Sequence, residues 1–369
     1  MSISQKKVKA CVGFLFFICE VLPHFSFEID TVLQKRITLS QERSLLLAVE
    51  SFVKTENDLF IIADYKDGSF KVYDDNGKLL TVWGRRGPGP LEFSSPVSTD
   101  YQKPLFAISD FTKQRIFIYE TIARYDFKKV TEFVVPVLDK VNIKLIDNQV
   151  LISGYIPVSE NKAYCLYAWD PKTRDIQYIL PEEVKYGFPS FREFNSKKGT
   201  VLDLGSAGFC DVLGDSIYFI WEGNLKVIKI NRTAKTWESF GEKTPNYRQP
   251  EVTQAVKDAI ARRSLKDIEA EYSKMSFVNG IFADEKFVGV IYQNYDRKIS
   301  LWRMFLQLYT PAGKLIQEEA LPDAVTYIDF RANNSFYDRA RKRLYYLSIR
   351  YDKESGLDKY EILEYQIGL

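Results

Sequence analysis

The sequence has almost no histidine, and this absence excludes several kinds of catalysis. Its 369 residues contain one histidine, His24, which lies in a segment with the pattern of a secretory signal. If that segment is removed, no imidazole remains. Nucleophilic catalysis by Ser-His-Asp or Cys-His arrangements is then excluded, and so are zinc sites with histidine ligands.

Cysteine is scarce, and neither sign of charge dominates. Of four cysteines, Cys165 and Cys210 lie outside the signal-like segment, and we expect buried free thiols unless the fold brings them within disulfide reach. Without residues 1–26 the chain has 48 basic and 48 acidic side chains. A nearly neutral protein lacks the basic surface that nucleic-acid binding requires, so we expect no nucleic-acid partner.

The N-terminus has the pattern of an export signal. Three lysines precede the apolar run Ala10–Cys19, as a basic region precedes the hydrophobic region of a signal peptide. This run is too short to span a bilayer. We therefore expect an extracytoplasmic protein, whether periplasmic, attached to the cell envelope or secreted. Its domains would be a signal-like segment, 1–26, and one folded domain, 27–369.

Three alternatives for this segment stay open. The chain is cleaved near Ser26, or it carries a lipid on Cys19, or the run forms a helix of the mature fold. Lipid attachment would place the protein at a membrane through its N-terminus only.

Internal repeats dominate the rest of the chain. Val72–Leu79 (VYDDNGKL) is similar to Leu308–Leu315 (LYTPAGKL), and each reads as an aromatic strand end, a polar turn and a new strand. A second repeated feature is an apolar strand that ends at a small or polar residue followed by an aromatic residue. Its instances are Asp64-Tyr65, Asp110-Phe111, Gly154-Tyr155, Asn294-Tyr295, Arg350-Tyr351 and, in reversed order, Trp221-Glu222. Steps of 46 and 44 residues separate Tyr65, Phe111 and Tyr155, which is a period typical of propeller blades.

The strand pattern predicts an all-β protein, a six-bladed β-propeller. Strands fall into six groups near 47–83, 96–136, 142–180, 205–240, 276–320 and 326–366. Inner strands such as Leu59–Ala63 are nearly continuous apolar runs, as in sheets that are covered on both faces. The last group has three clear strands, so we expect an N-terminal strand at Val32–Leu39 to complete it and close the ring.

One segment has a helical pattern instead. Pro250–Met275 carries apolar residues at about helical spacing after a proline suited to a first turn. We expect a helix or helix pair at about 250–275, inserted between the fourth and fifth groups. It is either a cap packed over the ring or a lid that docks a partner.

The segments Gly84–Pro96 (GRRGPGPLEFSSP) and Asp110–Tyr119 (DFTKQRIFIY) resemble the entry and continuation of an NHL repeat. The chain is thus similar to six-bladed propellers of the NHL-repeat and TolB-like type, which include secreted proteins of Gram-negative bacteria. The resemblance implies a propeller fold, and it is clearest in the first two blades.

The glycine- and proline-rich stretch after Gly84 is expected to cross from blade one to blade two. Arg85 and Arg86 would then lie on the rim of one face beside Asp64 and Asp110. They either pair with these aspartates or bind an anionic ligand, for which arginine geometry is well suited. Six aromatic residues would share that face and form stacking surfaces for a sugar or peptide, unless they pack between blades. They are Tyr65, Phe111, Tyr155, Trp221, Tyr295 and Tyr351.

The sequence favours a binding or interaction scaffold over an enzyme, and it assigns no catalytic residue. The expected partner is a protein, peptide or carbohydrate, and no cofactor is required. A structural role in a larger envelope complex is another interpretation. The resemblance also implies an alternative, a calcium-dependent hydrolase or lyase of the lactonase kind that uses the central channel. Its candidate ligands are Asp64, Asp110, Glu222 and Asn294.

Overall fold

The computed structural model describes residues 30–89, 91–123, 125–135, 141–159, 162–181, 191–195, 200–204, 208–251, 253–262, 264–326 and 334–368. The signal-like segment, with Cys19, His24 and Ser26, lies outside these residues, so the predictions about it stay predictions. Within the described part of the chain, none of the helices has the length and apolar character needed to span a bilayer.

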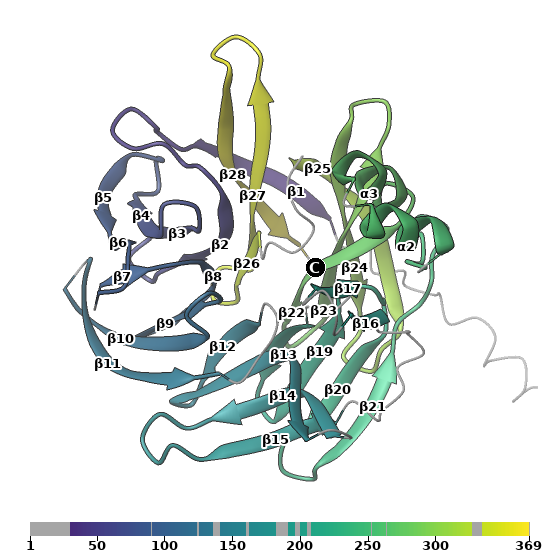
Figure 1. Cartoon of the computed structure of the whole chain (residues 1–369), viewed down its shortest axis with the longest axis horizontal. Coiled ribbons are helices and arrows are strands. Elements are labelled where there is room, and N and C mark those ends of the chain that lie inside the picture. The colour runs from purple at the N-terminus through teal and green to yellow at the C-terminus, as the bar shows by residue number, and fades with distance from the viewer. Residues whose placement is uncertain are drawn as a thin grey trace, which may run out of the picture.

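Six four-stranded antiparallel sheets form a ring, which confirms the predicted six-bladed propeller (Figure 1). Blade 1 contains β2 (Val49–Lys54), β3 (Phe60–Asp64), β4 (Ser69–Tyr73) and β5 (Leu79–Trp83). Blade 2 contains β8 (Pro96–Gln102), β9 (Leu105–Asp110), β10 (Arg115–Ala123) and β11 (Asp126–Val134). Blade 3 contains β12 (Asn142–Ile146), β13 (Gln149–Ser159), β14 (Lys162–Trp169) and β15 (Ile176–Pro181).

The second half of the ring repeats the same order. Blade 4 contains β18 (Gly208–Leu213), β19 (Ser216–Trp221), β20 (Val227–Asn231) and β21 (Thr236–Phe240). Blade 5 contains β22 (Ser276–Ala283), β23 (Val288–Asp296), β24 (Leu301–Tyr309) and β25 (Leu315–Thr326). Blade 6 contains β26 (Ser335–Asp338), β27 (Arg343–Asp352), β28 (Leu357–Ile367) and, from the N-terminus, β1 (Thr31–Thr38).

Strand β1 closes the ring as predicted. It pairs antiparallel with β28 from Thr31 opposite Ile367 to Thr38 opposite Glu361. Arg36 strengthens this closure, because its guanidinium contacts the carboxylates of Glu361 (2.8 Å) and Asp323 (2.7 Å). This pairing joins the two ends of the chain in one blade and covers the edge of β28 that would otherwise be open.

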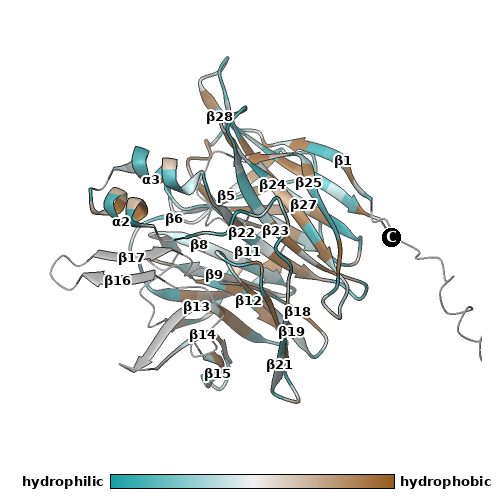
Figure 2. Cartoon of the chain, turned by 90° about the vertical axis from the view of Figure 1, so that its right-hand side faces the viewer, coloured by the Kyte–Doolittle hydropathy of each residue, from teal (hydrophilic) through white to brown (hydrophobic). Residues whose placement is uncertain are grey.

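The hydrophobic core is divided among the blade interfaces. Each of six clusters of buried side chains joins two neighbouring blades: for example, Phe60 of blade 1 packs with Tyr345 of blade 6, and Phe70 of blade 1 packs with Phe106 of blade 2. Figure 2 shows the apolar residues within the strands of the ring. Strands such as β3 are apolar along nearly their whole length because both faces of each sheet are covered.

The helical insertion is a helix pair, α2 (Gln254–Ala261) and α3 (Leu265–Tyr272). Each helix begins at a hydroxyl side chain that accepts a backbone N–H bond: Thr253 accepts from Val256 N at the start of α2, and Ser264 accepts from Asp267 N at the start of α3. Val256 and Tyr272 are buried in the cluster between blades 5 and 6. The pair therefore packs against the ring as a cap, in the place that the sequence predicted.

The two faces of the ring differ in their loops. One face, which we call the crossover face, carries the connections from the last strand of each blade to the first strand of the next. These connections include the helix pair, the hairpin of β16 (Phe191–Asn195) and β17 (Thr200–Leu204), and the short parallel pair β6 (Arg85–Arg86) and β7 (Glu92–Phe93). Figure 2 shows the helices, β16 and β17 together on this side of the molecule. The turns between second and third strands, at Tyr65 and Phe111, lie on the same face.

Candidate functional site

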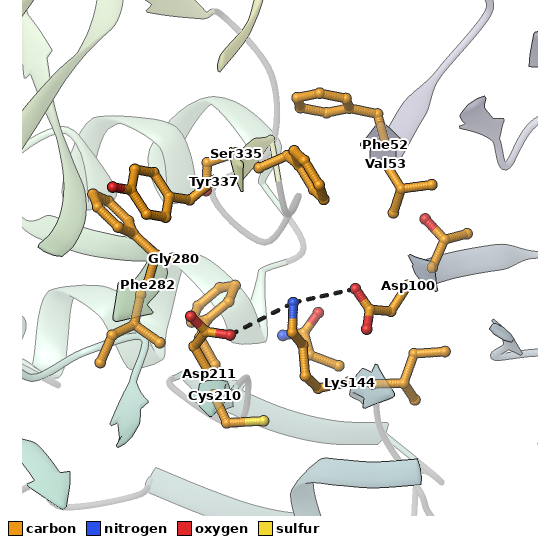
Figure 3. Close-up of a pocket in the computed structure, with 16 residues that line it drawn as sticks. Phe52, Val53, Asp100, Lys144, Cys210, Asp211, Gly280, Phe282, Ser335 and Tyr337 are labelled. Carbon is orange, nitrogen blue, oxygen red and sulfur yellow. Dashed lines mark hydrogen bonds and ion pairs between the residues drawn. The ribbon is translucent and has the colours of Figure 1, made fainter. Parts of the chain in front are cut away.

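The first strands of the six blades line a small central cavity (Figure 3). Its volume is about 60 Å³, which is room for about four water molecules. Phe52, Phe282 and other apolar side chains form one part of the wall. The polar part is formed by Asp100 of β8, Lys144 of β12 and Asp211 of β18. A cavity of this size suits water or a very small molecule rather than a sugar or peptide.

An ion network crosses the channel between blades. Lys144 Nζ lies 3.3 Å from Asp100 Oδ1 and 3.6 Å from Asp211 Oδ1 (Figure 3). The other oxygen of each carboxylate accepts a backbone N–H from the next blade. Asp100 bonds Leu145 N at 2.7 Å, and Asp211 bonds Ala283 N at 2.8 Å. Arg339, after β26, also contacts Asp211, so four blades contribute charges that balance one another.

Burial affects the two ends of this network differently. It raises the pKa of Asp100. Lys144 and the Leu145 N–H lower that pKa, but by less than burial raises it. Burial would lower the pKa of Lys144, but the carboxylates of Asp100 and Asp211 outweigh it and raise that pKa. Lys144 is therefore an ammonium ion at neutral pH. The neighbouring Cys210 thiol has its pKa raised to about 12 by burial, so it is a poor nucleophile.

The candidate calcium ligands do not converge. Among the residues that the structure describes, no group of three or more His, Cys, Asp or Glu side chains is placed to hold a metal ion. Asp64 and Asp110 bind backbone N–H groups, and Asn294 bonds Ser276 and the Asn246 carbonyl oxygen. In the channel, the position between Asp100 and Asp211 is taken by Lys144. The calcium-dependent alternative stays a prediction, and the donor set does not fit it.

Asp64 and Asp110 occupy equivalent places in blades 1 and 2. Asp64 is fully buried and accepts from Leu47 N (2.7 Å), Ala48 N (3.2 Å) and Lys71 Nζ (2.7 Å). Asp110 is also buried and accepts from Ser94 N (2.7 Å) and Ser95 N (3.1 Å). Each carboxylate therefore fastens the entry of its blade to the turn after its second strand. This explains the repeated Asp-aromatic pair in the sequence.

The two arginines follow a left-handed turn that needs glycine. Gly84 has φ of 77°, and a Cβ there would lie 2.8 Å from the Phe93 ring. Arg85 is 80% exposed and contacts Glu92 Oε1 at 2.7 Å, while Arg86 Nη1 donates to the Lys66 carbonyl oxygen at 3.1 Å. The interpretation that these arginines pair with Asp64 and Asp110 is wrong, because backbone N–H groups already occupy the buried carboxylates.

The six predicted aromatic residues do not share one environment. Tyr65 and Phe111 are each 38% exposed on the crossover face. Trp221 packs edge-on against Phe219 (5.1 Å), and Tyr295 packs edge-on against Trp302 (5.5 Å). Tyr351 is 58% exposed, but it lies near the tip of the β27–β28 hairpin, which projects outward from the ring (Figure 1). Tyr155 belongs to β13, and its side chain lies outside the described part of the structure.

Three leucines that the sequence did not single out complete the surface around Tyr65 and Phe111. Leu45 and Leu47 are each 44% exposed in the entry to blade 1, and Leu91 is 46% exposed in the entry to blade 2. The signal that could have found them is their position in loops, outside the strand alternation. The five exposed apolar side chains and four nearby cations make up what we call the crossover patch. They are Leu45, Leu47, Tyr65, Leu91 and Phe111, with Lys66, Arg85, Arg86 and Lys113.

Hydrogen bonds link the loops of the crossover patch to one another. Tyr65 N donates to Ala48 O (2.9 Å), so the turn of blade 1 lies against the loop of Leu45 and Leu47. Arg86 reaches the Lys66 carbonyl, and Lys113 Nζ donates to Glu92 O at 2.6 Å. The patch therefore runs over adjoining loops of blades 1 and 2.

The sequence matches no protein-family model and no curated protein. The solved structures that are similar in fold include two from Bacteroides species. A member of the DUF4221 family from Bacteroides vulgatus is 11% identical with a TM-score of 0.61, over 92% of this chain and 98% of that chain. A putative exported protein from Bacteroides fragilis is 12% identical with a TM-score of 0.57, over 92% of this chain and 96% of that one. At this identity they show the shared propeller fold, and the finer resemblance to NHL-repeat and TolB-like proteins stays a resemblance.

Proposed function

We propose that this chain is an extracytoplasmic binding protein whose crossover patch takes an apolar, acidic segment of a partner protein. The observation that carries the proposal is the group of five large apolar side chains, each 38% to 46% exposed, on adjoining loops bordered by four cations. Exposed large apolar side chains gathered on adjoining loops of a folded domain are typical of a binding site. The signal-like N-terminus supports the extracytoplasmic location, and the name of the Bacteroides fragilis structure, an exported protein, agrees with it.

The charges favour an acidic partner. Asp64 and Asp110 are buried under the patch and their carboxylates are bonded to backbone N–H groups, so they present no negative charge to a ligand. Glu92 is the carboxylate near the arginines, and Arg85 contacts it through Nε and Nη2 only. The remaining guanidinium N–H groups of Arg85 are free to bind carboxylates, which arginine does well. Leucines with a tyrosine and a phenylalanine would cover the apolar part of the segment.

Selection of peptides from a random displayed library on the full chain tests this proposal. We expect the selected peptides to combine Asp or Glu with Leu or aromatic residues. Their affinity should fall at least about tenfold with Arg85→Glu and Arg86→Glu together, and by a similar factor with Leu47→Ser and Phe111→Ser together. Affinity is measured by calorimetric titration with the synthetic peptide, after a thermal melt has shown that each variant folds.

Matched controls change charge or apolar surface elsewhere. Lys103→Glu with Arg262→Glu reverses two exposed cations, and Trp237→Ser removes a side chain that is 51% exposed on the outer strand of blade 4. Neither control should alter the affinity. Selected peptides without acidic residues, or an affinity that depends on the controls as strongly as on the patch, would contradict the proposal. Binding of carbohydrate instead would move the function to a different class of partner.

A further inference from the structure

A second hollow lies where the last blade meets the first, on the face opposite the crossover face. Its volume is about 400 Å³, which is within the range of small-molecule sites. We call it the seam groove and define it by its charged residues, which are Lys35, Lys54, Asp58, Asp75, Arg341, Arg343 and Glu364. It shares no residue with the crossover patch or with the channel network.

Strand register explains why these side chains meet. Lys35 of β1 is opposite Glu364 of β28, and Glu364 is opposite Tyr345 of β27, so the three lie in one row across blade 6. Residues paired in this way project from the same side of a sheet. Blade 1 faces this row with Lys54, Asp58 and Phe60. The groove therefore spans the seam that β1 closes.

The floor of the groove is closely packed. Tyr345 is 2% exposed, its ring centroid lies 5.7 Å from that of Phe60, and Lys54 Nζ lies 5.2 Å from the Tyr345 ring centroid. Asp58 binds both Lys54 and Arg341, with Arg341 Nη2 at 3.0 Å from its second oxygen. One carboxylate thus serves two cations, of which Lys54 is almost wholly buried.

The other cations of the groove have donors to spare. Arg343 Nη1 is buried and makes no hydrogen bond within the described chain, and the nearest carboxylate oxygen, of Glu364, is 3.4 Å away. Lys35 Nζ donates to the Asp75 carbonyl oxygen at 2.7 Å and not to a carboxylate. The Asp75 carboxylate itself accepts from the Asn76 amide at 3.0 Å. The lining holds four cations and three carboxylates, and Asp338 just outside it lies 3.6 Å from Arg341 Nη1. The spare donors of the groove are therefore those of Arg343 and Lys35.

We propose that the seam groove binds a small molecule through a compact oxyanion, which is a phosphate, sulfate or carboxylate group held by Arg343 and Lys35. Arginine offers several planar N–H donors and lysine offers three, so oxyanions supply the acceptors that the groove lacks. Such a ligand bridges the N-terminal strand, the last blade and the loop of blade 1. Binding would then stabilise the closed ring, because a ligand that binds only the folded state raises its stability by mass action.

Calorimetric titration of the full chain with inorganic phosphate, sulfate and acetate tests this site, with thermal melts at each concentration. We expect saturable binding of at least one of the three and a melting temperature that rises with its concentration. Sodium chloride at equal ionic strength should not reproduce the rise. The three arms show which oxyanion the groove prefers.

Two substitutions of opposite expected effect keep the test decisive. Lys35→Gln with Arg343→Gln should weaken binding at least about tenfold, since two donors and two charges are lost. Glu364→Gln removes the carboxylate beside Arg343 and should strengthen binding. Lys103→Gln with Arg262→Gln makes the same change of net charge elsewhere and should leave binding unaltered.

Three results would overturn the proposal. They are no saturable binding of any of the three anions, a rise in melting temperature that sodium chloride reproduces, and binding that survives the loss of Lys35 and Arg343. If that double variant does not fold, Glu364→Gln decides alone, and weaker binding by it contradicts the site. None of these results bears on peptide binding at the crossover patch.

Discussion

The channel and the crossover face use charged residues in opposite ways. In the channel, Lys144 lies between Asp100 and Asp211, which come from different blades, and the charges pair with one another. On the crossover face, Asp64 and Asp110 point inward to the backbone, while Arg85 and Arg86 point outward to solvent. The same residue types thus join blades in one region and leave a cationic, apolar surface in the other.

The difference follows from the free energy of burial. A charge removed from water is tolerated only when partners of opposite charge and hydrogen bonds replace the water, so the channel charges are bound to one another. An exposed ion pair such as Arg85–Glu92 contributes little, because water and salt screen it. Residues of the first kind are expected to support the fold, and residues of the second kind are available for a ligand.

The largest effect is expected from Lys144→Met, which leaves two carboxylates in the channel without their shared cation. Breaking a buried ion pair by removing one partner lowers the free energy of unfolding by about 3–5 kcal/mol. We expect a loss near the lower end of that range, since 29% of the Lys144 side chain is accessible through the cavity. Urea denaturation at neutral pH measures it.

The control for this substitution is Lys66→Met, an exposed lysine on the crossover face. Its effect on the free energy of unfolding should be within about 0.5 kcal/mol. Asp100→Asn, introduced together with Lys144→Met, should restore part of the loss because it removes one of the unpaired charges. Equal stability of Lys144→Met and the wild type would show that the channel network has no structural role.

A smaller effect is expected where the carboxylates bind mostly backbone. Asp110→Asn replaces one acceptor oxygen with an amide N–H that faces backbone donors, and losing such a bond reduces the free energy of unfolding by about 1–3 kcal/mol. Asp64→Asn should reduce it more than Asp110→Asn does. The reason is that Asp64 also contacts the fully buried Lys71, whose remaining partners would be Asp67 at 2.8 Å and Ser69 Oγ at 3.5 Å.

Measuring both variants under identical conditions isolates the contribution of Lys71. The control is Asp64→Asn with Lys71→Met, in which the buried cation is absent as well. The free energy of unfolding of this double variant should lie nearer to that of Asp110→Asn than the value for Asp64→Asn does. An Asp110→Asn variant less stable than Asp64→Asn would contradict the assigned roles.

The repeated features of the sequence predicted most of the fold. The Asp-aromatic pairs recur because Asp64 and Asp110 each accept a backbone N–H bond from the entry of their blade. An unpaired strand at the front, matched with a three-stranded group at the end, predicted the closure by β1. The helix pair was visible as the one stretch with helical spacing.

The candidate site was predictable only in part, because its contacts join residues that are far apart in sequence. Asp100, Lys144 and Asp211 each read as an isolated charge within a strand, and ring formation alone brings them together. The partner of Arg85 is Glu92, within the same loop, and its geometry depends on the left-handed turn at Gly84. The exposure of Leu47 and Leu91 also follows from how the loops lie, which strand periodicity does not describe.

The smallest expected effect is on how the free energy of unfolding depends on pH, which should differ between the channel and the crossover face. Burial raises the pKa of Asp100, so the folded state holds that proton more tightly than the unfolded chain does. The stability that comes from protonated Asp100 is present below the ordinary Asp pKa of about 3.9 and is lost as the pH rises through the higher pKa of the folded state. Asp100→Asn removes this trend.

Glu92 on the crossover face should change the stability with pH in the opposite direction. The Gly89 N–H and then Arg85 lower the pKa of Glu92, so its stabilising contribution is present above the ordinary Glu pKa of about 4.3 and is lost as the pH falls below it. Urea denaturation between about pH 3 and pH 6 should therefore show wild type gaining stability relative to Asp100→Asn on acidification, and losing it relative to Glu92→Gln. Added salt should reduce the Glu92 difference, because it screens the exposed Arg85 charge, and spare the Asp100 difference, which lies in the channel. If salt removed both differences equally, the channel charges would be as open to solvent as those of the crossover face, and the contrast between the two regions would fail.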